Sequence, residues 1–287
     1  MILVAGATGY LGRYIVQEAL QRGHPTRALV RSPHKLADGS GVDLFVGHAT
    51  QPSTLNGVMS GVDTVISALG ITRQRDGLTY DQVDYAANRH LLDAAVAHGV
   101  RKFVYVSVLR GPQLRHLAIC AAKERFADAL AQAPIEHAIV RPGGYFSDLS
   151  AFYDMARQGR AYVFGDGTTR ANPIHGADLA RVCLDMVHSS LESLDVGGPN
   201  VLTQHQVAEL AFKAAGKHPR IIHVPDWLRR LALKLGRWVL NPARFGPIEF
   251  FLHAMATDMV GPAAGTHTLA DHFERLHAAH QGSIKTL

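Results

Sequence analysis

Residues 6–12 read Gly6-Ala7-Thr8-Gly9-Tyr10-Leu11-Gly12 and directly follow the apolar run Ile2 to Ala5. A helical pattern begins inside this stretch, so its glycines lie where a strand turns into a helix. Gly6 permits a tight turn, Gly9 lets the backbone approach a phosphate, and Gly12 lets the helix pack closely on the strand. The free N–H groups at the start of the helix attract phosphate. The spacing therefore predicts a dinucleotide site formed by Gly6, Thr8, Gly9, Tyr10, Leu11 and Gly12.

Short apolar runs alternate with helical patterns over the first 145 residues. This alternation predicts an α/β fold, a doubly wound parallel Rossmann sheet with helices on both faces. The predicted strands are Ile2 to Ala5, Arg27 to Val30, Leu44 to Val46, Thr64 to Ser67, Phe103 to Ser107 and Ala138 to Val140. The predicted helices are Leu11 to Gln21, Ser53 to Met59, Tyr80 to Ala97 and Leu114 to Ala131.

A smaller C-terminal lobe is expected after Pro142-Gly143-Gly144, where the pattern becomes mixed. Residues 1–145, completed by 171–190, would form the dinucleotide domain, and residues 146–170 and 191–287 the substrate lobe. The lobe region and its border contain extended pieces at Ala161 to Phe164 and Asn172 to Ile174, a helix at Ala177 to Val187, and a helix at Gln204 to Ala215 with a Thr203/Gln206 capping box.

Residues 226–240 form a basic amphipathic stretch that contains Trp227 and Trp238. We expect this stretch to bury its apolar stripe on the small lobe. The alternative is peripheral contact with a membrane or a partner through the same residues.

The composition narrows the class of protein. With 287 residues and 47% hydrophobic content the chain can bury a large core, and its formal charge of +5 is scattered, which argues against nucleic acid. Cys120 and Cys183 are the only cysteines and no 18-residue apolar run occurs, so we expect a cytoplasmic protein without a disulfide or a transmembrane segment. Despite 17 histidines, no metal-ligand spacing appears, and no metal is expected. No feature indicates the oligomeric state.

The second predicted strand ends at Arg31, where sites for NAD carry an acidic residue that binds the ribose 2′-OH. A guanidinium matches phosphate geometry, so Arg31, with Lys35 and Arg13, could neutralise a 2′-phosphate. This pattern favours NADP(H) over NAD(H). Solvated surface charges without a ligand remain the alternative interpretation.

Further motifs follow the glycine turn in a fixed order. They are RALVRSPHK at 27–35, VISALG at 65–70, DYAAN at 84–88, FVYVS at 103–107, RPGGYF at 141–146, NPIHGADLA at 172–180 and VGGP at 196–199. In this order they resemble the short-chain dehydrogenase/reductase superfamily, and within it the atypical NmrA-like and isoflavone-reductase-like proteins. The resemblance covers about residues 1–225.

The resemblance implies positions for the cofactor. Residues expected to border it are Ser67, Ala68, Leu69, Val106, Pro142 and Gly143, and Asn88 would support the sheet beside them. The family's usual Gly-Asp after the third strand is here Gly47-His48-Ala49, so His48 and Ala49 would meet the adenine. A surface histidine without a role is the alternative for His48.

Ordinary members of the superfamily carry a tyrosine four residues before a lysine on one helix. Here Ile119 takes that place before Lys123, and an aliphatic side chain cannot donate a proton. The resemblance implies that Lys123 binds the nicotinamide ribose and is a candidate acid; a merely solvated lysine is the alternative. His116, expected two turns earlier on the same helix face, Tyr145 and Ser107 are the other catalytic candidates.

Two functional hypotheses follow from these residues and the resemblance. The first is an NADP(H)-dependent oxidoreductase that reduces a small apolar or aromatic carbonyl, enone or quinone-like acceptor held between the lobes. The second is a non-catalytic NADP(H)-binding redox sensor or accessory protein, consistent with the missing tyrosine. A third and weaker hypothesis is an assembly factor of a membrane complex that uses residues 226–240.

Overall fold

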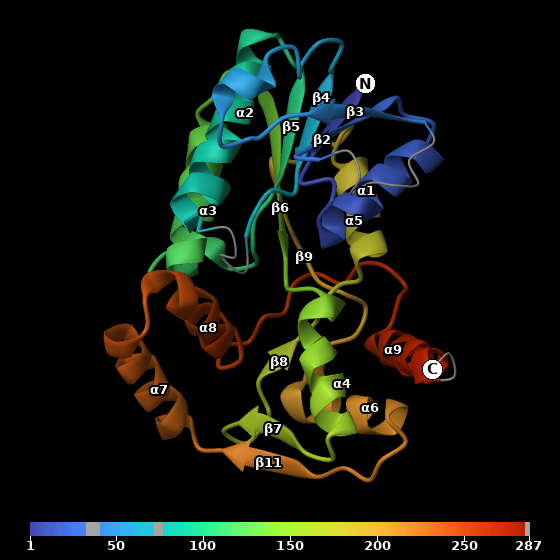
Figure 1. The fold of residues 1–287 in the computed structure, drawn as a ribbon, viewed down its shortest axis with the longest axis vertical. Coiled ribbons are helices and arrows are strands. Elements are labelled where there is room, and N and C mark those ends of the chain that lie inside the picture. Colours follow the sequence, from blue (N-terminus) through green and yellow to red (C-terminus); the bar gives the residue numbers. More distant parts are fainter. Residues whose placement is uncertain (33–40, 72–76, 285–287) are drawn as a thin grey trace. The chain divides into compact units, whose positions relative to one another are not determined.

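The computed structural model describes residues 1–32, 41–71 and 77–284. The chain divides into two compact units, which are described separately below. The first unit comprises Met1–Arg141 and Leu179–Asp195, and the second comprises Pro142–Asp178 and Val196–Leu287. Figure 1 shows the elements of each unit along the sequence.

The first unit is built on a seven-stranded sheet with the order β3-β2-β1-β4-β5-β6-β9. All neighbours from β3 to β6 pair in parallel. The strands are β1 (Ile2–Ala5), β2 (Thr26–Val30), β3 (Val42–Val46), β4 (Thr64–Ser67), β5 (Lys102–Val106), β6 (Glu136–Pro142) and β9 (Ser193–Val196). The strand order reverses between β1 and β4, and open α/β sheets bind ligands at the carboxyl ends of strands at such a point. The predicted Rossmann sheet is confirmed.

Helices cover both faces of this sheet, with α2 and α3 on one side and α1 and α5 on the other (Figure 1). Their bounds are α1 (Tyr10–Gln21), α2 (Asn88–Ala97), α3 (Ala118–Ala131) and α5 (Gly176–Asp185). The core under α2 and α3 is apolar and includes the fully buried Leu3, Leu91, Phe103, Tyr105 and Phe126. Burial on both faces explains why the central strands are continuous apolar runs.

The structure departs in detail from three local predictions for the first unit. The helix expected over Tyr80 to Ala97 begins with a π-helical stretch, Asp81–Ala87, before α2. The helix expected from Leu114 begins only at Ala118, after the 3-10 turn Gly111–Leu114, because Leu117 is extended. Between Ser53 and Met59 the only helix is the 3-10 turn Pro52–Leu55.

The second unit contains two small sheets and most of the C-terminal helices. β7 (Ala161–Phe164) pairs in parallel with β11 (Ile221–Val224), and β8 (Arg170–Ala171) pairs antiparallel with β10 (Leu202–Thr203). The helices are α4 (Ser150–Arg157), α6 (Gln204–Ala214), α7 (Asp226–Val239), α8 (Pro242–Ala254) and α9 (Leu269–Ile284). Of the extended piece expected at Asn172 to Ile174, Ile174 forms only an isolated bridge, to Tyr145.

Side chains on α4, α6 and α9 form the core of this unit, including the fully buried Tyr153, Phe212 and Phe273. The expected capping box opens α6: Gln206 N–H donates to Thr203 Oγ1 at 3.2 Å, and Thr203 N–H donates to Gln206 Oε1 at 2.9 Å. Two reciprocal bonds satisfy donors that a helix start otherwise leaves unpaired.

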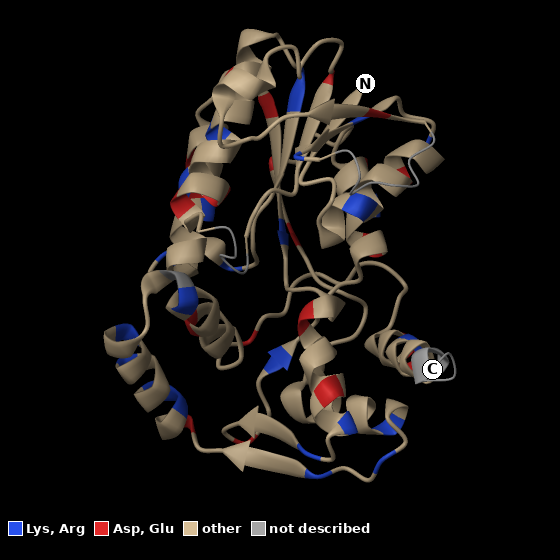
Figure 2. Cartoon of the chain, viewed as in Figure 1, with Lys and Arg blue, Asp and Glu red and all other residues tan. Residues whose placement is uncertain are grey.

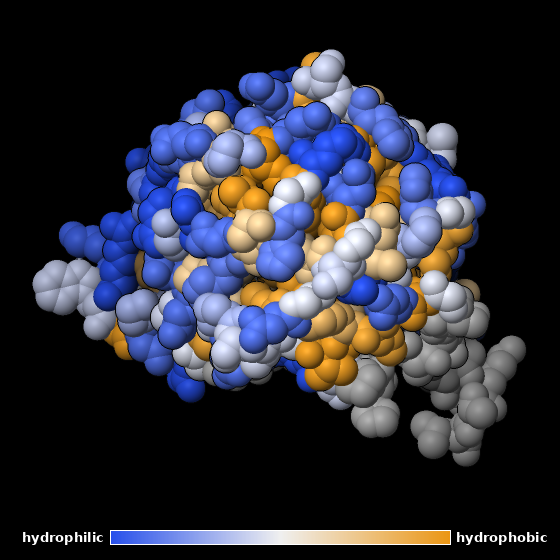
Figure 3. Space-filling view, turned by 90° about the horizontal axis from the view of Figure 1, so that it is seen from above, coloured by the Kyte–Doolittle hydropathy of each residue, from blue (hydrophilic) through white to orange (hydrophobic). Residues whose placement is uncertain are grey.

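Helix α7 corrects another expectation. It does not bury its apolar stripe on the lobe: none of its residues is buried, and Trp227 and Trp238 are 62% and 86% exposed. Apolar side chains also reach the surface in the view of Figure 3, where orange patches lie among hydrophilic residues. Within residues 1–32, 41–71 and 77–284, no helix combines the length and apolar character needed to cross a bilayer.

Candidate functional site

The glycine turn after β1 is shaped by close backbone contacts. Gly6 has a φ of +80°, a conformation that favours glycine, and its carbonyl accepts a hydrogen bond from Gly9 N–H at 2.9 Å. A Cβ on Gly12 would lie 2.0 Å from Gly6 O, so only glycine fits where α1 crosses the turn. This arrangement opens the start of α1 toward a bound phosphate.

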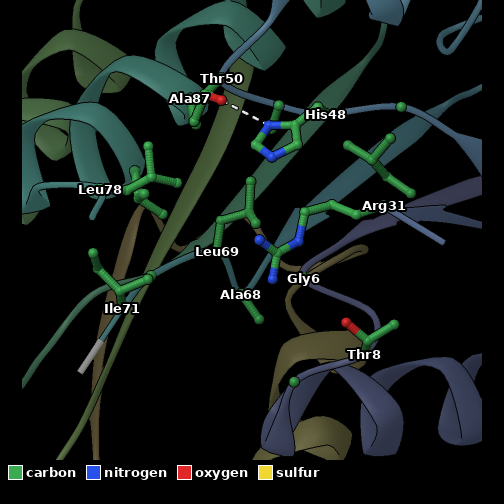
Figure 4. A pocket seen from close by; sticks show the side chains of 16 residues that line it. Gly6, Thr8, Arg31, His48, Thr50, Ala68, Leu69, Ile71, Leu78 and Ala87 are labelled. Atoms are coloured by element: carbon green, nitrogen blue, oxygen red, sulfur yellow. Dashed lines mark hydrogen bonds between the residues drawn. The ribbon is translucent and has the colours of Figure 1, made fainter. Parts of the chain in front are cut away.

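A pocket of about 460 Å³ lies beside this turn (Figure 4). It is lined by the glycine turn, by the ends of β2 and β4, by the segment after β3 and by the π-helical stretch. The lining residues are Gly6, Thr8, Gly9, Leu29, Arg31, Gly47, His48, Ala49, Thr50, Ala68, Leu69, Gly70, Ile71, Leu78, Val83 and Ala87. A glycine cradle next to a cation and apolar walls fits a dinucleotide, with phosphates at the turn and flat rings against the walls.

The side chain of Arg31 extends from the end of β2 into this pocket, with its guanidinium beside Gly6, Ala68 and Leu69 (Figure 4). It occupies the position at which NAD-binding sites place a carboxylate. Arg13 is exposed on α1 and is not among the lining residues. Lys35 lies outside the described residues, so its predicted role stays a prediction.

The segment after β3 forms another wall. His48 Nδ1 is 2.6 Å from Thr50 Oγ1, and His48 N–H donates to Thr54 Oγ1 at 2.9 Å. The Ala49 carbonyl lies 2.9 Å from His90 Nδ1. These bonds hold the His48 ring at the pocket edge, where it could meet a flat base (Figure 4). Thr50, which orients the ring, was not expected from the sequence.

The wall formed after β4 is supported by Asn88. Ser67 is fully buried and donates through Oγ to Asn88 Oδ1 at 2.5 Å. Asn88 Nδ2 donates to the carbonyls of Val83 and Asp84 at 3.3 and 3.0 Å. The π-helical stretch changes the spacing of its carbonyls, and the amide satisfies two of them. Ser67 therefore supports the wall from within, while Ala68 and Leu69 line it.

Lys123 on α3 forms an ion pair that the sequence did not indicate. Its Nζ lies 3.1 Å from Oδ1 of Asp84, which is fully buried, and 5.6 Å from the centre of the Tyr105 ring. Burial raises the pKa of the Asp84 carboxyl, although the Lys123 charge opposes that rise. Burial also raises the pKa of Tyr105 well above its usual value. Tyr105 is therefore a poor proton donor.

Gly70 connects this ion pair to the pocket. It lines the pocket, and a Cβ on it would lie 2.7 Å from Asp84 Oδ1 and 2.8 Å from Lys123 Nζ. Its neighbour Ile71 donates its N–H to Asp84 Oδ2 at 3.3 Å. The ammonium of Lys123 thus lies directly behind a glycine of the pocket wall.

Ser107 belongs to a different, buried network. Its Oγ donates to Glu124 Oε1 at 2.6 Å, and Arg141 Nη2 donates to Glu124 Oε2 at 3.0 Å. Ser107 and Glu124 are 4% and 1% exposed, and neither lines the pocket. The predicted catalytic role of Ser107 stays a prediction. Val106, also predicted to border the cofactor, is buried at the end of β5.

The remaining candidates lie elsewhere. His116 is exposed in the turn before α3, so the expectation that it shares a helix face with Lys123 is wrong. Pro142 ends β6, Gly143 N–H donates to Val196 O at 2.9 Å, and the partly buried Tyr145 precedes a 3-10 turn. Pro142, Gly143 and Tyr145 belong to the second unit. Their predicted roles stay predictions.

The fold, the glycine turn and the pocket together define a Rossmann-type dinucleotide-binding protein. Residues 6–190 match a protein family described as NAD(P)H-binding. The match spans more than half of the chain, and the chain belongs to this family. In the described residues, no group of three or more His, Cys, Asp or Glu side chains could hold a metal ion.

Two relatives show what this family contains. The chain is 31% identical to the chloroplastic divinyl chlorophyllide a 8-vinyl-reductase of Oryza sativa subsp. indica, over 96% of this chain and 78% of that protein. It is 29% identical to the photosystem II assembly factor Ycf39 of Synechocystis sp., over 84% of this chain and 76% of that protein. The family is therefore reductase-like and also includes an assembly factor.

Two solved structures share the fold. The NADPH-dependent quinone oxidoreductase QOR2 of Escherichia coli, complexed with NADPH, has a TM-score of 0.76 at 21% identity, covering 96% of this chain and 99% of that one. An isoflavone reductase has a TM-score of 0.74 at 20% identity, covering 96% and 98%. The predicted likeness to isoflavone-reductase-like proteins is confirmed at the level of the fold.

Proposed function

We propose that this protein is an NADPH-dependent reductase of a small conjugated acceptor, such as an enone or a quinone. One observation carries the cofactor preference: the Arg31 guanidinium enters the pocket where NAD-binding sites place a carboxylate. A guanidinium pairs with a 2′-phosphate through charge-assisted hydrogen bonds. The adenosine end would then lie between Arg31 and His48.

The names of two similar proteins support the type of acceptor. The rice relative is a vinyl reductase, and the bacterial neighbour is a quinone oxidoreductase. Both names describe reduction of a conjugated system. When bound, the reduced nicotinamide supplies a hydride. The protein then has to orient the acceptor and hold a proton.

Lys123 is the residue proposed to hold that proton. Its side chain is 13% exposed, and the carboxylate of Asp84 favours its charged form. From its place behind Gly70, the ammonium could hydrogen-bond a ribose hydroxyl and stabilise charge developing on the acceptor. His116 and Tyr145 remain secondary candidates for the proton, because Ile119 at the usual tyrosine position cannot donate one.

The test is NADPH oxidation measured with a panel of aldehydes, enones and quinones. We expect turnover with at least one conjugated acceptor, loss of turnover in Lys123→Ala, and unchanged turnover in Lys213→Ala, an exposed lysine on α6. Calorimetry on the same samples separates binding from chemistry. Failure of folded protein to take up either dinucleotide would refute the proposal.

A second candidate function has its own support. The buried Ile119 replaces the usual acid, and the cyanobacterial relative is named as an assembly factor. We propose as the alternative an accessory or redox-sensing protein of the NmrA-like type that binds NADPH without turning it over. Tight NADPH binding without oxidation across the whole panel would favour this function. A cytoplasmic location is proposed for either function.

A further inference from the structure

Helix α7 directs an apolar surface away from the rest of the second unit. At about 100° per residue, its exposed large apolar side chains share an arc of about 120°. These side chains, here called the apolar arc, are Trp227, Leu228, Leu231, Leu235, Trp238 and Val239, and they are 39% to 86% exposed. A soluble helix normally turns such an arc toward the core. This helix does the reverse.

The opposite side of α7 fixes this orientation. A Cβ on Gly236 would lie 2.5 Å from the Phe245 ring, so α7 packs closely on α8 there. Arg237 Nε donates to Glu249 Oε1 at 3.1 Å, and Arg229 Nη1 donates to the Leu252 carbonyl at 3.3 Å. These contacts hold the polar side of α7 against α8 and leave the apolar arc outside.

Cations line a second pocket, of about 490 Å³, between α7 and the end of α8. Its lining includes Arg229, Arg230, Lys234, Arg237, Trp238 and His253. Asp226 pairs with both Arg229 and Arg230, and Glu249 pairs with Arg237. Together with Lys234, four cations therefore face two carboxylates. Figure 2 shows the resulting concentration of Lys and Arg along α7.

The cations border the apolar arc on the side that carries both tryptophans. By helical spacing, Lys234 lies next to Trp227 and Trp238, with Arg230 beyond it. Tryptophan suits the boundary between lipid tails and water, and long basic side chains reach from that boundary to phosphate groups. This order of apolar arc, tryptophan and cation matches a helix that lies flat in a bilayer surface.

We propose that α7 docks this protein on an anionic phospholipid surface, with the apolar arc in the acyl boundary and the cationic pocket on lipid phosphates. Charge favours a lipid surface over a second copy as the occupant. A second copy would present the same excess of cations, four against two carboxylates, whereas an anionic surface supplies the missing negative charge. An anionic surface satisfies both the apolar arc and the cations.

The experiment uses full-length protein and vesicles of phosphatidylcholine with or without phosphatidylglycerol. Trp227 and Trp238 are the protein's two tryptophans, so tryptophan fluorescence reports on α7 alone. We expect a blue shift and flotation with the anionic vesicles only. Lys234→Gln should weaken partitioning about fivefold, and Leu235→Glu at least about tenfold.

The matched control for Leu235→Glu is Leu191→Glu, because the two leucines are 54% and 53% exposed. Circular dichroism and NADPH binding establish that each variant is folded. No flotation with anionic vesicles, equal flotation with neutral vesicles, or equal loss in Leu191→Glu would each overturn the proposal. A blue shift without vesicles, accompanied by a doubled mass in light scattering, would assign the surface to a second copy instead.

Discussion

The Lys123 ammonium lies 3.1 Å from a carboxylate oxygen of Asp84, a residue without solvent exposure. Tyr105 is packed beside the pair and also fully buried, so little water can screen the attraction. Removing one partner leaves an uncompensated buried charge, which costs about 3 to 5 kcal/mol. The pair therefore couples the stability of the first unit to the placement of Lys123.

Asp84→Asn and Lys123→Met should each lower the free energy of unfolding by about 3 kcal/mol or more. The double variant should cost less than the two single costs combined, because no buried charge is left alone. Urea unfolding of the four proteins measures this coupling. The control is Arg89→Ala, which breaks an exposed pair with Asp93 and should change stability by less than about 1 kcal/mol. Additive single effects would show that the pair is not coupled.

Arg31→Ala should weaken NADPH binding about 10- to 100-fold and leave NADH binding nearly unchanged. The reason is that charge-assisted hydrogen bonds contribute about 1.5 to 3 kcal/mol each, and only NADPH carries the 2′-phosphate. Fluorescence titration with both dinucleotides measures the ratio. Arg13→Ala, at an exposed position outside the pocket lining, tests the lesser candidate. An unchanged preference in Arg31→Ala would remove the argument for NADP.

Two alanine substitutions in the glycine turn should have different effects. Gly12→Ala places a Cβ 2.0 Å from Gly6 O and should destabilise the fold by more than about 2 kcal/mol. The Cβ added in Gly9→Ala would lie 3.2 Å from the same oxygen, and Gly9 already has a negative φ. This variant should therefore fold while losing dinucleotide affinity. Thermal melts and NADPH titration distinguish the two outcomes. Wild-type affinity in Gly9→Ala would contradict the predicted approach of phosphate to this position.

The stability of the second unit should depend on pH through His175. Its ring stacks on His267 at 4.2 Å, and His267 Nδ1 lies 2.9 Å from Asp178 Oδ1. Burial, followed by the charges of His267 and Arg275, lowers the pKa of His175 to about 4, while Asp178 opposes the shift and His272 adds to it. Between pH 4 and 6.5 the unfolded chain therefore binds more protons than the native protein.

It follows that the contribution of His175 to the free energy of unfolding is complete above about pH 6.5. This contribution is lost as pH falls toward 4, by up to about 3 kcal/mol. Urea unfolding at a series of pH values measures this slope. His175→Gln should flatten the slope, and His98→Gln, at an exposed position on the first unit, should not. A slope that His175→Gln leaves intact would assign the pH dependence to other groups.

Most of the Rossmann sheet could be predicted because its central strands are buried on both faces and read as continuous apolar runs. β9 was missed because it lacks such a run: in Ser193–Val196 only Val196 is buried. The π-helical stretch Asp81–Ala87 was missed because one extra residue per turn barely changes a helical pattern over seven residues. Asn88, in the motif DYAAN at 84–88, was the only sequence signal near this π-helical stretch.

Local sequence determined the glycine turn and the position of Arg31. The glycines are required by contacts within the turn itself, and Arg31 is placed by the strand that directly precedes it. Both features therefore depend on only a few neighbours along the chain. Only the tertiary structure decided that Lys123 meets Asp84, 39 positions earlier, and that α7 turns its apolar arc outward. Periodicity shows that a helix has two different faces. Which face becomes buried depends on packing partners that are distant in the chain, and those are defined only once the chain has folded.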